Sequence, residues 1–297
     1  MLPQLTDWRL TMVALPTPSD RHLMGSWGKA YTTEQVSRLA PPVATDTHRP
    51  KDHHTLFDMV SNALGRSGFE HSEPLHYVGT GKVLGNDAPA KFMTVMNIQH
   101  QSINSNIGKM QMNRQLFIQN SYDKSLSIRL IVGIEVMICT NGLTMGHVED
   151  EIRRKQTKHV DDDLYKVVYG GVDNILGQLT HQQETITSLM GTEMTDRMAD
   201  HVIMDAMRAK VINPAGVGDV WDKWKHPNYE EYKDRNAWSL VNAFTERARG
   251  RNIFGRHKQQ DNLLRIVDDY TTSSPVEEDV VYTQAEPVDR FASSPDF

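Results

Sequence analysis

The chain has 297 residues, of which 38% are hydrophobic and 24% charged, so it can bury a substantial core in one large domain or two small ones. Its single cysteine, Cys139, excludes a disulfide framework and a cysteine-based zinc finger, and fits a reducing compartment. No run of about 18 apolar residues is present, so no transmembrane helix is expected. The N-terminus lacks the pattern of a secretory signal. These features predict a soluble, cytoplasmic protein.

The formal net charge of −6 is unevenly distributed along the chain. Residues 268–297 contain eight acids and one base, Arg290, and therefore carry −7, which leaves +1 for residues 1–267. A near-neutral body with an acidic C-terminal appendage suits different partners from a uniformly acidic protein.

The N-terminal part is predicted to be irregular at first and helical afterwards. Six prolines interrupt residues 1–50. One short helix is expected there, because Thr32 and Gln35 form a capping box and Pro41 stops the helix. A longer helix is expected to begin at Thr55 as its N-cap and to close at Gly68.

The next part of the chain has the pattern of a sheet. Residues 75–84, 91–100, 114–120 and 126–139 are rich in β-forming side chains and are separated by Gly, Asn and Asp. This pattern predicts an antiparallel meander of four or five strands. Residues 127–139 are apolar enough for a central strand pair or for one long strand bent at Gly133.

The C-terminal half is predicted to be helical. Apolar residues recur at helical spacing from Asp163 to Val202, with interruptions expected at Gly170-Gly171 and at Gly191, and another helix is expected at 237–248. After Tyr270 no apolar period remains, which predicts disorder. We therefore expect an α+β fold. It would comprise an irregular segment at 1–50, a core domain at 51–270 in which an antiparallel meander is flanked by N-terminal helices and a larger helical half, and a disordered acidic tail at 271–297.

Motifs of the common enzyme classes are absent. The sequence has no nucleotide-binding, serine-hydrolase, zinc-protease or calcium-loop motif. His54 and Asp58 could place two metal ligands on one helix face, although such a pair is more often a surface feature. Asp161, Asp162 and Asp163 could form a magnesium site, but acids at a helix start more often cap the helix. We therefore expect no enzyme activity, no metal and no cofactor.

Basic residues give a stronger signal, for nucleic-acid binding. Cationic groups neutralise phosphates and aromatic rings stack on bases, which holds single strands without reading their sequence. The same clusters could also be solvated helix ends. Three sets are candidates: Lys109, Arg114, Lys124 and Arg129 in the sheet region; Arg153, Arg154, Lys155 and Lys158; and Arg247, Arg249, Arg251, Arg256 and Lys258 around Phe254.

The C-terminal tail ends in an acid followed by an aromatic residue, Asp296 and Phe297. Single-stranded DNA-binding proteins of bacteria and some phages carry tails of this kind. Their acids compete with DNA for the basic groove, and the terminal Phe docks in pockets on replication proteins. Asp296 and Phe297 are therefore expected to bind such a partner, the alternative being an ordinary disordered terminus.

Four short motifs are spread along the chain. Residues 120–123 read Asn-Ser-Tyr-Asp ahead of the apolar strand, which ends in Cys-Thr-Asn-Gly-Leu at 139–143. Residues 155–159 read Lys-Gln-Thr-Lys-His, and residues 238–246 read Trp-Ser-Leu-Val-Asn-Ala-Phe-Thr-Glu. These motifs resemble those of a phage and plasmid family called domain of unknown function 932, over most of residues 30–250. The sequence departs from the family at Arg247 and in its acidic tail.

The resemblance implies a mobile genetic element rather than a particular reaction. At the level of fold, a meander joined to helices is similar to the ring-forming annealing proteins of phage recombination. We therefore expect a phage-encoded single-stranded DNA-binding or strand-annealing protein of replication or recombination, in the cytoplasm of the infected bacterial host. It could form a homo-oligomer and would not contact a membrane. An inhibitor of a host or anti-phage defence factor is the alternative, and a nuclease with an unrecognised carboxylate site is a third candidate.

Overall fold

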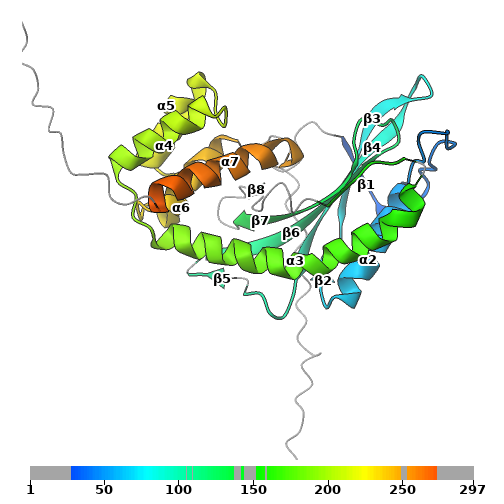
Figure 1. Cartoon of the computed structure of the whole chain (residues 1–297), viewed down its shortest axis with the longest axis horizontal. Helices are drawn as coiled ribbons and strands as arrows, with labels where there is room; N and C mark the ends of the chain where they lie inside the picture. The colour runs from blue at the N-terminus through cyan, green and yellow to red at the C-terminus, as the bar shows by residue number, and fades with distance from the viewer. Residues whose placement is uncertain are drawn as a thin grey trace, which may run out of the picture.

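The structure, a computed structural model, describes residues 28–104, 106–108, 110–136, 142–143, 152–157, 159–248 and 253–272. The expectations for residues 1–27, for the turn at Asn141 and for the tail from residue 273 onward lie outside these ranges. Within them the fold is α+β, as the sequence predicts: an antiparallel sheet lies beside a group of helices, and one long helix joins the two (Figure 1).

The sheet is built on the predicted meander. Its main path joins strands β1 (Lys29–Tyr31), β3 (Leu75–Val83), β4 (Asn86–Gln99), β6 (Met110–Ser121), β7 (Ile128–Val136) and β8 (Gly142–Leu143), in that order. Three short strands extend it: β2 (Glu70–His71) pairs with β4, β5 (Asn106–Ile107) with β6, and β9 (Ile152–Arg154) with β7. All these pairings are antiparallel.

One detail of the sheet differs from the sequence-based expectation, and another decides between its two alternatives. Strand β1 lies within a segment that was expected to be irregular apart from one helix, and it pairs with β3 through Ala30 opposite Tyr77. Three residues are too few to show a strand period in the sequence. Strand β7 is a single strand through Gly133, which lies opposite Gln115 of β6.

The two N-terminal helices begin with side-chain caps. The predicted capping box is confirmed at α1 (Thr33–Ser37), where Thr32 accepts from the Gln35 amide and the Gln35 side chain accepts from the Thr32 amide. Helix α2 (His53–Arg66) starts earlier than expected, because Asp52 rather than Thr55 is its N-cap. Gly68, with φ of +78°, closes α2 as predicted, since this left-handed conformation favours glycine.

Helix α3 (Val160–Gly191) is continuous through Gly170 and Gly171, where an interruption was expected. The apolar stripe stays in helical phase across the two glycines, because Val168 and Val172 are both fully buried. Packing on the sheet therefore outweighs the low helix propensity of glycine. The helix ends at Gly191, as predicted.

The helical group contains α4 (Asp196–Arg208), α5 (Val217–Lys225), α6 (Ala237–Arg247) and α7 (Ile253–Thr272), with short 3-10 turns at Pro214–Gly216 and Glu230–Tyr232. Helix α7 was not predicted as an element. Its N-terminal part is dominated by polar and basic residues, and only its later turns bury Leu263 and Val267.

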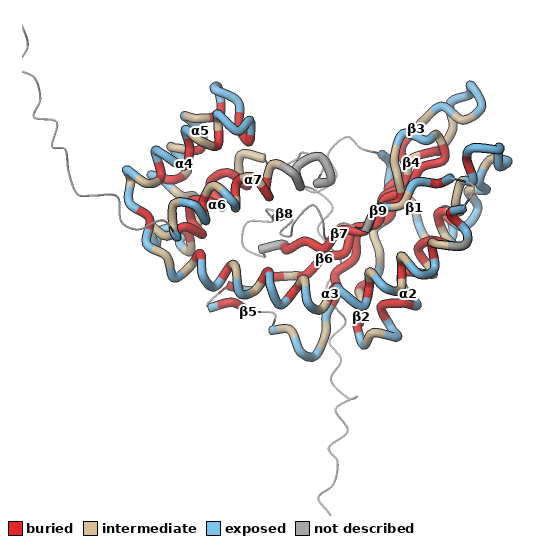
Figure 2. The backbone as a smooth tube through the Cα atoms, viewed as in Figure 1, coloured by how far each residue is buried: buried red, intermediate tan, exposed pale blue. Residues whose placement is uncertain are grey.

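Two apolar cores hold the protein together, one on each side of the joining helix. Helices α2 and α3 cover one face of the sheet and bury Leu56, Leu116 and Val172 between them. The other core gathers Trp224, Trp238 and neighbours from α4 to α7. Figure 2 shows the central strands buried along their length, whereas burial on α3 alternates with its turns. Among the described residues, no helix is long and apolar enough to span a bilayer.

Candidate nucleic-acid interface

A network of buried polar side chains ties the end of β6 to the segment before α2 and to the segment before α3. The side-chain nitrogen of Asn120, Nδ2, donates to the Lys51 carbonyl oxygen at 2.8 Å, and its side-chain oxygen accepts from Gln156 Nε2 at 2.9 Å. Gln156 also donates to the Ser121 carbonyl oxygen at 2.7 Å and accepts from the Lys51 amide at 2.6 Å. Three chain segments distant in sequence are therefore fixed to one another.

His53 is stacked inside the same network. Its ring lies 3.8 Å from the Tyr122 ring and 4.8 Å from the Phe92 ring, centroid to centroid, and it is nearly parallel to both. Asn120 Nδ2 donates to His53 Nδ1 at 3.0 Å, which places the ring proton on Nε2. No described group accepts this proton. Burial lowers the pKa of His53 to about 3, so the imidazole is neutral.

The low pKa of His53 makes stability dependent on pH. An unfolded histidine binds a proton near pH 6.5, whereas folded His53 does not until about pH 3, so the unfolded state is favoured as pH falls through this window. We expect His53 alone to lower the free energy of unfolding by on the order of 3 kcal/mol between pH 6.5 and 4. Urea unfolding of wild type and His53→Gln across this range measures the difference in slope. His226→Gln, at an exposed position, is the control for the loss of a histidine outside the buried network.

A cavity of about 280 Å³ opens beside this network, at the turn between β6 and β7. Its charged lining is entirely cationic, and hydroxyl groups surround it. We call it the basic pocket; it is lined by Thr47, His48, Lys124, Ser125, Leu126, Ser127, Arg153, Lys155, Gln156 and Thr157.

Two chain segments bring the cations of the basic pocket together. Lys124 has a φ of +64° in the β6–β7 turn, Arg153 lies on β9, and Lys155 follows β9. All three are exposed, and none has an ion pair with an acid among the described residues. Arg153 Nε donates to Ser127 Oγ at 3.0 Å, which holds its guanidinium at the pocket.

The surrounding cations are arranged differently. Lys51 is paired with Asp161, and Arg154 with Asp163, so these two cations join neighbouring segments to the first turn of α3. Hydrogen bonding to Lys51 lowers the pKa of Asp161. Helix α3 begins at Val160, so Asp161, Asp162 and Asp163 lie in its first turn, near the positive end of the helix dipole. Two of them, Asp161 and Asp163, also form the ion pairs described above.

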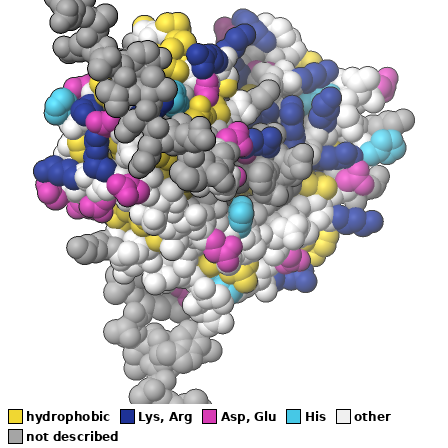
Figure 3. Space-filling view, turned by 60° about the vertical axis from the view of Figure 1, so that its left-hand side comes forward, with side chains coloured by type: hydrophobic (Ala, Val, Ile, Leu, Met, Phe, Trp, Pro, Cys, Tyr) yellow, Lys and Arg dark blue, Asp and Glu magenta, His cyan; other side chains and the backbone are white. Residues whose placement is uncertain are grey.

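Arg129 and Arg153 lie directly opposite each other across β7 and β9. Like charges at directly opposed positions of an antiparallel pair are destabilising. In the view of Figure 3, Lys and Arg side chains gather at the upper right, whereas acidic and basic side chains mix at the left.

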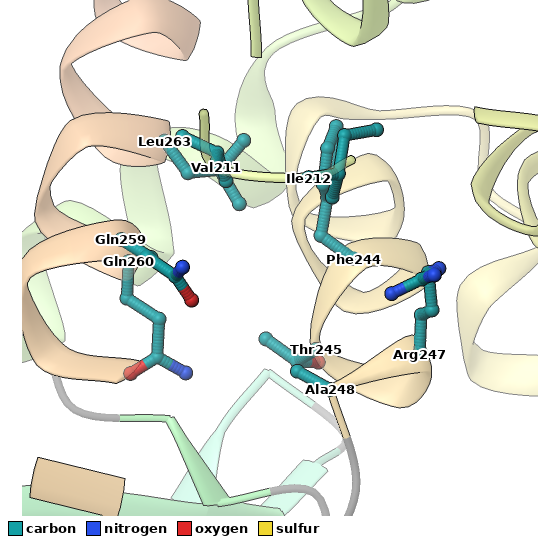
Figure 4. Close-up of a pocket in the computed structure, with 9 residues that line it drawn as sticks. All are labelled: Val211, Ile212, Phe244, Thr245, Arg247, Ala248, Gln259, Gln260 and Leu263. Carbon is teal, nitrogen blue, oxygen red and sulfur yellow. The ribbon is translucent and has the colours of Figure 1, made fainter. Parts of the chain in front are cut away.

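Two other candidate residues are engaged inside the protein. Arg114, on β6, is only 4% exposed, and burial lowers its pKa to about 10, so it does not reach a surface open to DNA. Arg247, at the end of α6, donates to Asp219 at 3.2 Å and to Asn213 at 3.1 Å. Figure 4 shows its guanidinium directed away from Gln259 and Gln260 of α7, across a small cavity of about 30 Å³.

The structure does not bring the remaining candidates into a described site. Lys109, Lys158, Arg249, Arg251, Asp296 and Phe297 lie outside the described residues, as do the side chains of Phe254, Arg256 and Lys258. His54 and Asp58 form a half-buried pair at 2.9 Å, and no group of three metal-ligating residues occurs in the described part of the chain.

Sequence reasoning missed the hydroxyl residues of the basic pocket. Ser125, Ser127, Thr47 and Thr157 have no distinctive spacing, and they meet only because the β6–β7 turn folds against the segments at 47 and 157. The signal that could have located them was the position of Lys124 between Ser121 and Ser125, in the turn that follows a predicted strand.

Comparison with known proteins identifies a family. No curated protein and no solved structure matches the chain. The model of one family, described as a domain of unknown function (DUF932), matches residues 43–269, which is more than half of the chain. The match spans strands β2 to β9, the basic pocket, the joining helix and nearly all of the helical group. The chain therefore belongs to the domain of unknown function 932 family.

Proposed function

We propose that this chain binds single-stranded DNA, with the basic pocket as a phosphate site. The observation that carries the proposal is the meeting of Lys124, from the β6–β7 turn, with Arg153 and Lys155, from β9 and the residue after it, at one cavity without an acid partner among the described residues. Cations held together against their mutual repulsion fit an anionic ligand, and phosphate is the anion that a nucleic acid presents repeatedly.

The chemistry of the pocket favours binding without reading of sequence. Ammonium and guanidinium groups contact phosphate oxygens, and the hydroxyl group of Ser127, whose oxygen accepts from Arg153, can donate a further hydrogen bond. The pocket belongs to a turn and an edge strand rather than to a helix that could enter a major groove. Contacts of this type are made to the phosphate backbone of the nucleic acid and are electrostatic, so the affinity falls as salt increases.

The proposal includes a biological role and a second contact. We propose that the chain acts in phage replication or recombination, as a binding or strand-annealing protein in the cytoplasm of the host, and that it binds DNA without cleaving it. The acidic tail ending in Asp296 and Phe297 would recruit replication proteins, because an aromatic ring beside a terminal carboxylate can anchor in a basic-rimmed apolar pocket.

Fluorescence anisotropy with the full chain and a labelled thymidine oligonucleotide tests the binding function. We expect saturable binding at 50 mM salt, and unlabelled oligonucleotides of the same and of a different sequence should compete equally well. The oligonucleotide should remain intact after incubation with magnesium or manganese. Absence of binding at low salt would contradict the proposal and favour the inhibitor hypothesis. Cleavage that is lost on changing Asp161, Asp162 and Asp163 to Asn would favour a nuclease instead.

A further inference from the structure

Two tyrosine rings are stacked on the outer surface of α3, beside the C-terminal end of α2. The ring centroids of Tyr165 and Tyr169 are 4.1 Å apart at an interplanar angle of 27°. The Arg66 guanidinium carbon lies 4.9 Å from the Tyr169 centroid, and Arg66 donates to the Tyr165 hydroxyl at 3.0 Å. We call these three side chains the tyrosine platform.

Packing against the apolar core accounts for the position of Tyr169 but not for that of Tyr165. Tyr169 is partly buried against the core between α2, α3 and the sheet. Tyr165 belongs to no apolar cluster of the described residues and is 50% exposed. Its hydroxyl binds Arg66, so the ring is held in a fixed orientation while much of its surface stays in contact with water. A fixed, exposed ring beside a guanidinium is the arrangement on which a nucleobase can stack.

The tyrosine platform lies near the basic pocket. Thr157 lines the pocket and accepts from the Val160 amide through its carbonyl oxygen in the first turn of α3. Tyr165 is five residues into this helix, about 8 Å along its axis at 1.5 Å per residue. Asp161 and Tyr165 are four residues apart and therefore share a helix face. Asp161 is paired with Lys51, so a cation accompanies this acid near the start of the helix.

We propose that the tyrosine platform stacks a base of a single strand whose phosphates occupy the basic pocket. This inference rests on the proposed function and adds a base contact to it. Because every base has a π-face, stacking here would be tolerant of sequence. Asp173 lies one turn of α3 beyond Tyr169 and accepts a hydrogen bond from Ser67 at 2.7 Å. Its carboxylate adds negative charge at the end of the platform that is farther from the start of α3. The strand therefore extends from the platform toward the pocket rather than past Asp173.

Two labelled probes of equal length separate stacking from phosphate binding: a thymidine oligonucleotide and the same backbone made wholly of abasic sites. We expect Tyr165→Ala to weaken binding of the thymidine oligonucleotide by at least about 5-fold, since stacking contributes about 1–3 kcal/mol per base. Binding of the abasic backbone should be unchanged. Tyr165→Phe keeps the ring and loses only the hydroxyl bond to Arg66, so it should bind nearly as wild type.

Each other outcome overturns a specific statement. If wild type binds both probes and Tyr165→Ala affects neither, or affects both equally, no base stacks on the platform, while the phosphate site stands. If wild type binds neither probe, both proposals fail. An oligonucleotide carrying 5-bromodeoxyuridine provides a second test on wild type. Photo-cross-links at Tyr165 or Tyr169 support stacking, and cross-links confined to other residues overturn it and leave the platform as a protein contact.

Discussion

Replacing Lys124, Arg153 and Lys155 together by Gln is expected to weaken binding of single-stranded DNA by roughly 30- to 150-fold at low salt. This range corresponds to about 0.7–1 kcal/mol for each exposed ionic contact with a phosphate. Gln keeps much of each aliphatic stem, so packing at the pocket is preserved while the three charges are removed. Fluorescence anisotropy at 50 mM salt measures the affinities of the variant and the wild type.

A matched control separates the pocket from net charge. Arg38, Arg208 and Lys233 are exposed and paired with acids three or four residues away on their own helix or turn. Changing these three to Gln also removes three positive charges, yet it should alter affinity by less than about 3-fold, because long-range effects are screened over about 10 Å at 0.1 M salt. Equal losses in the two triple variants would show that net charge alone drives binding.

Asn120→Ala is expected to destabilise the protein by about 3–4 kcal/mol, a large share of a typical stability of 5–15 kcal/mol. The change leaves the Lys51 carbonyl, the Ser121 amide and His53 Nδ1 without the hydrogen bond that each makes to Asn120. Each unsatisfied buried group costs about 1–3 kcal/mol, with part recovered by relaxation or by water. Urea unfolding at pH 7 measures the change in the free energy of unfolding.

The control for this variant replaces an asparagine that is exposed to solvent. Asn62, on the exposed face of α2, should change stability by no more than about 0.5 kcal/mol on replacement by Ala. If Asn120→Ala were equally mild, the network would not be what holds the β6 end to the segments before α2 and α3. The basic pocket would then need another explanation for its shape.

The sequence predicted the fold where the signal is local. The capping box at Thr32 and Gln35, the closing glycine of α2 and the strands of the meander follow from the spacing of neighbouring residues. It did not predict β1, which forms only because β3 offers an edge, or α7, whose N-terminal half is mostly polar and basic in sequence. It also predicted a break at Gly170 that packing against the sheet overrides.

The candidate site depended more strongly on contacts between distant segments. The cluster around Lys155 is visible in the sequence, but its meeting with Lys124 at one cavity follows from the antiparallel pairing of β7 with β9. Charge alone cannot separate a binding residue from a structural one. Arg114 and Arg247 have the same side chain as Arg153, yet one is buried in the sheet and the other is bonded to Asp219 and Asn213.

The salt dependence of affinity tests the central claim most directly. Each phosphate neutralised on a single strand contributes about −0.7 to the slope of log affinity against log salt. If Lys124, Arg153 and Lys155 each contact a phosphate, their replacement by Gln should make the slope less steep by about 2 between 50 and 200 mM salt. A slope identical to that of wild type would show that DNA, if it binds, does not bind through the basic pocket.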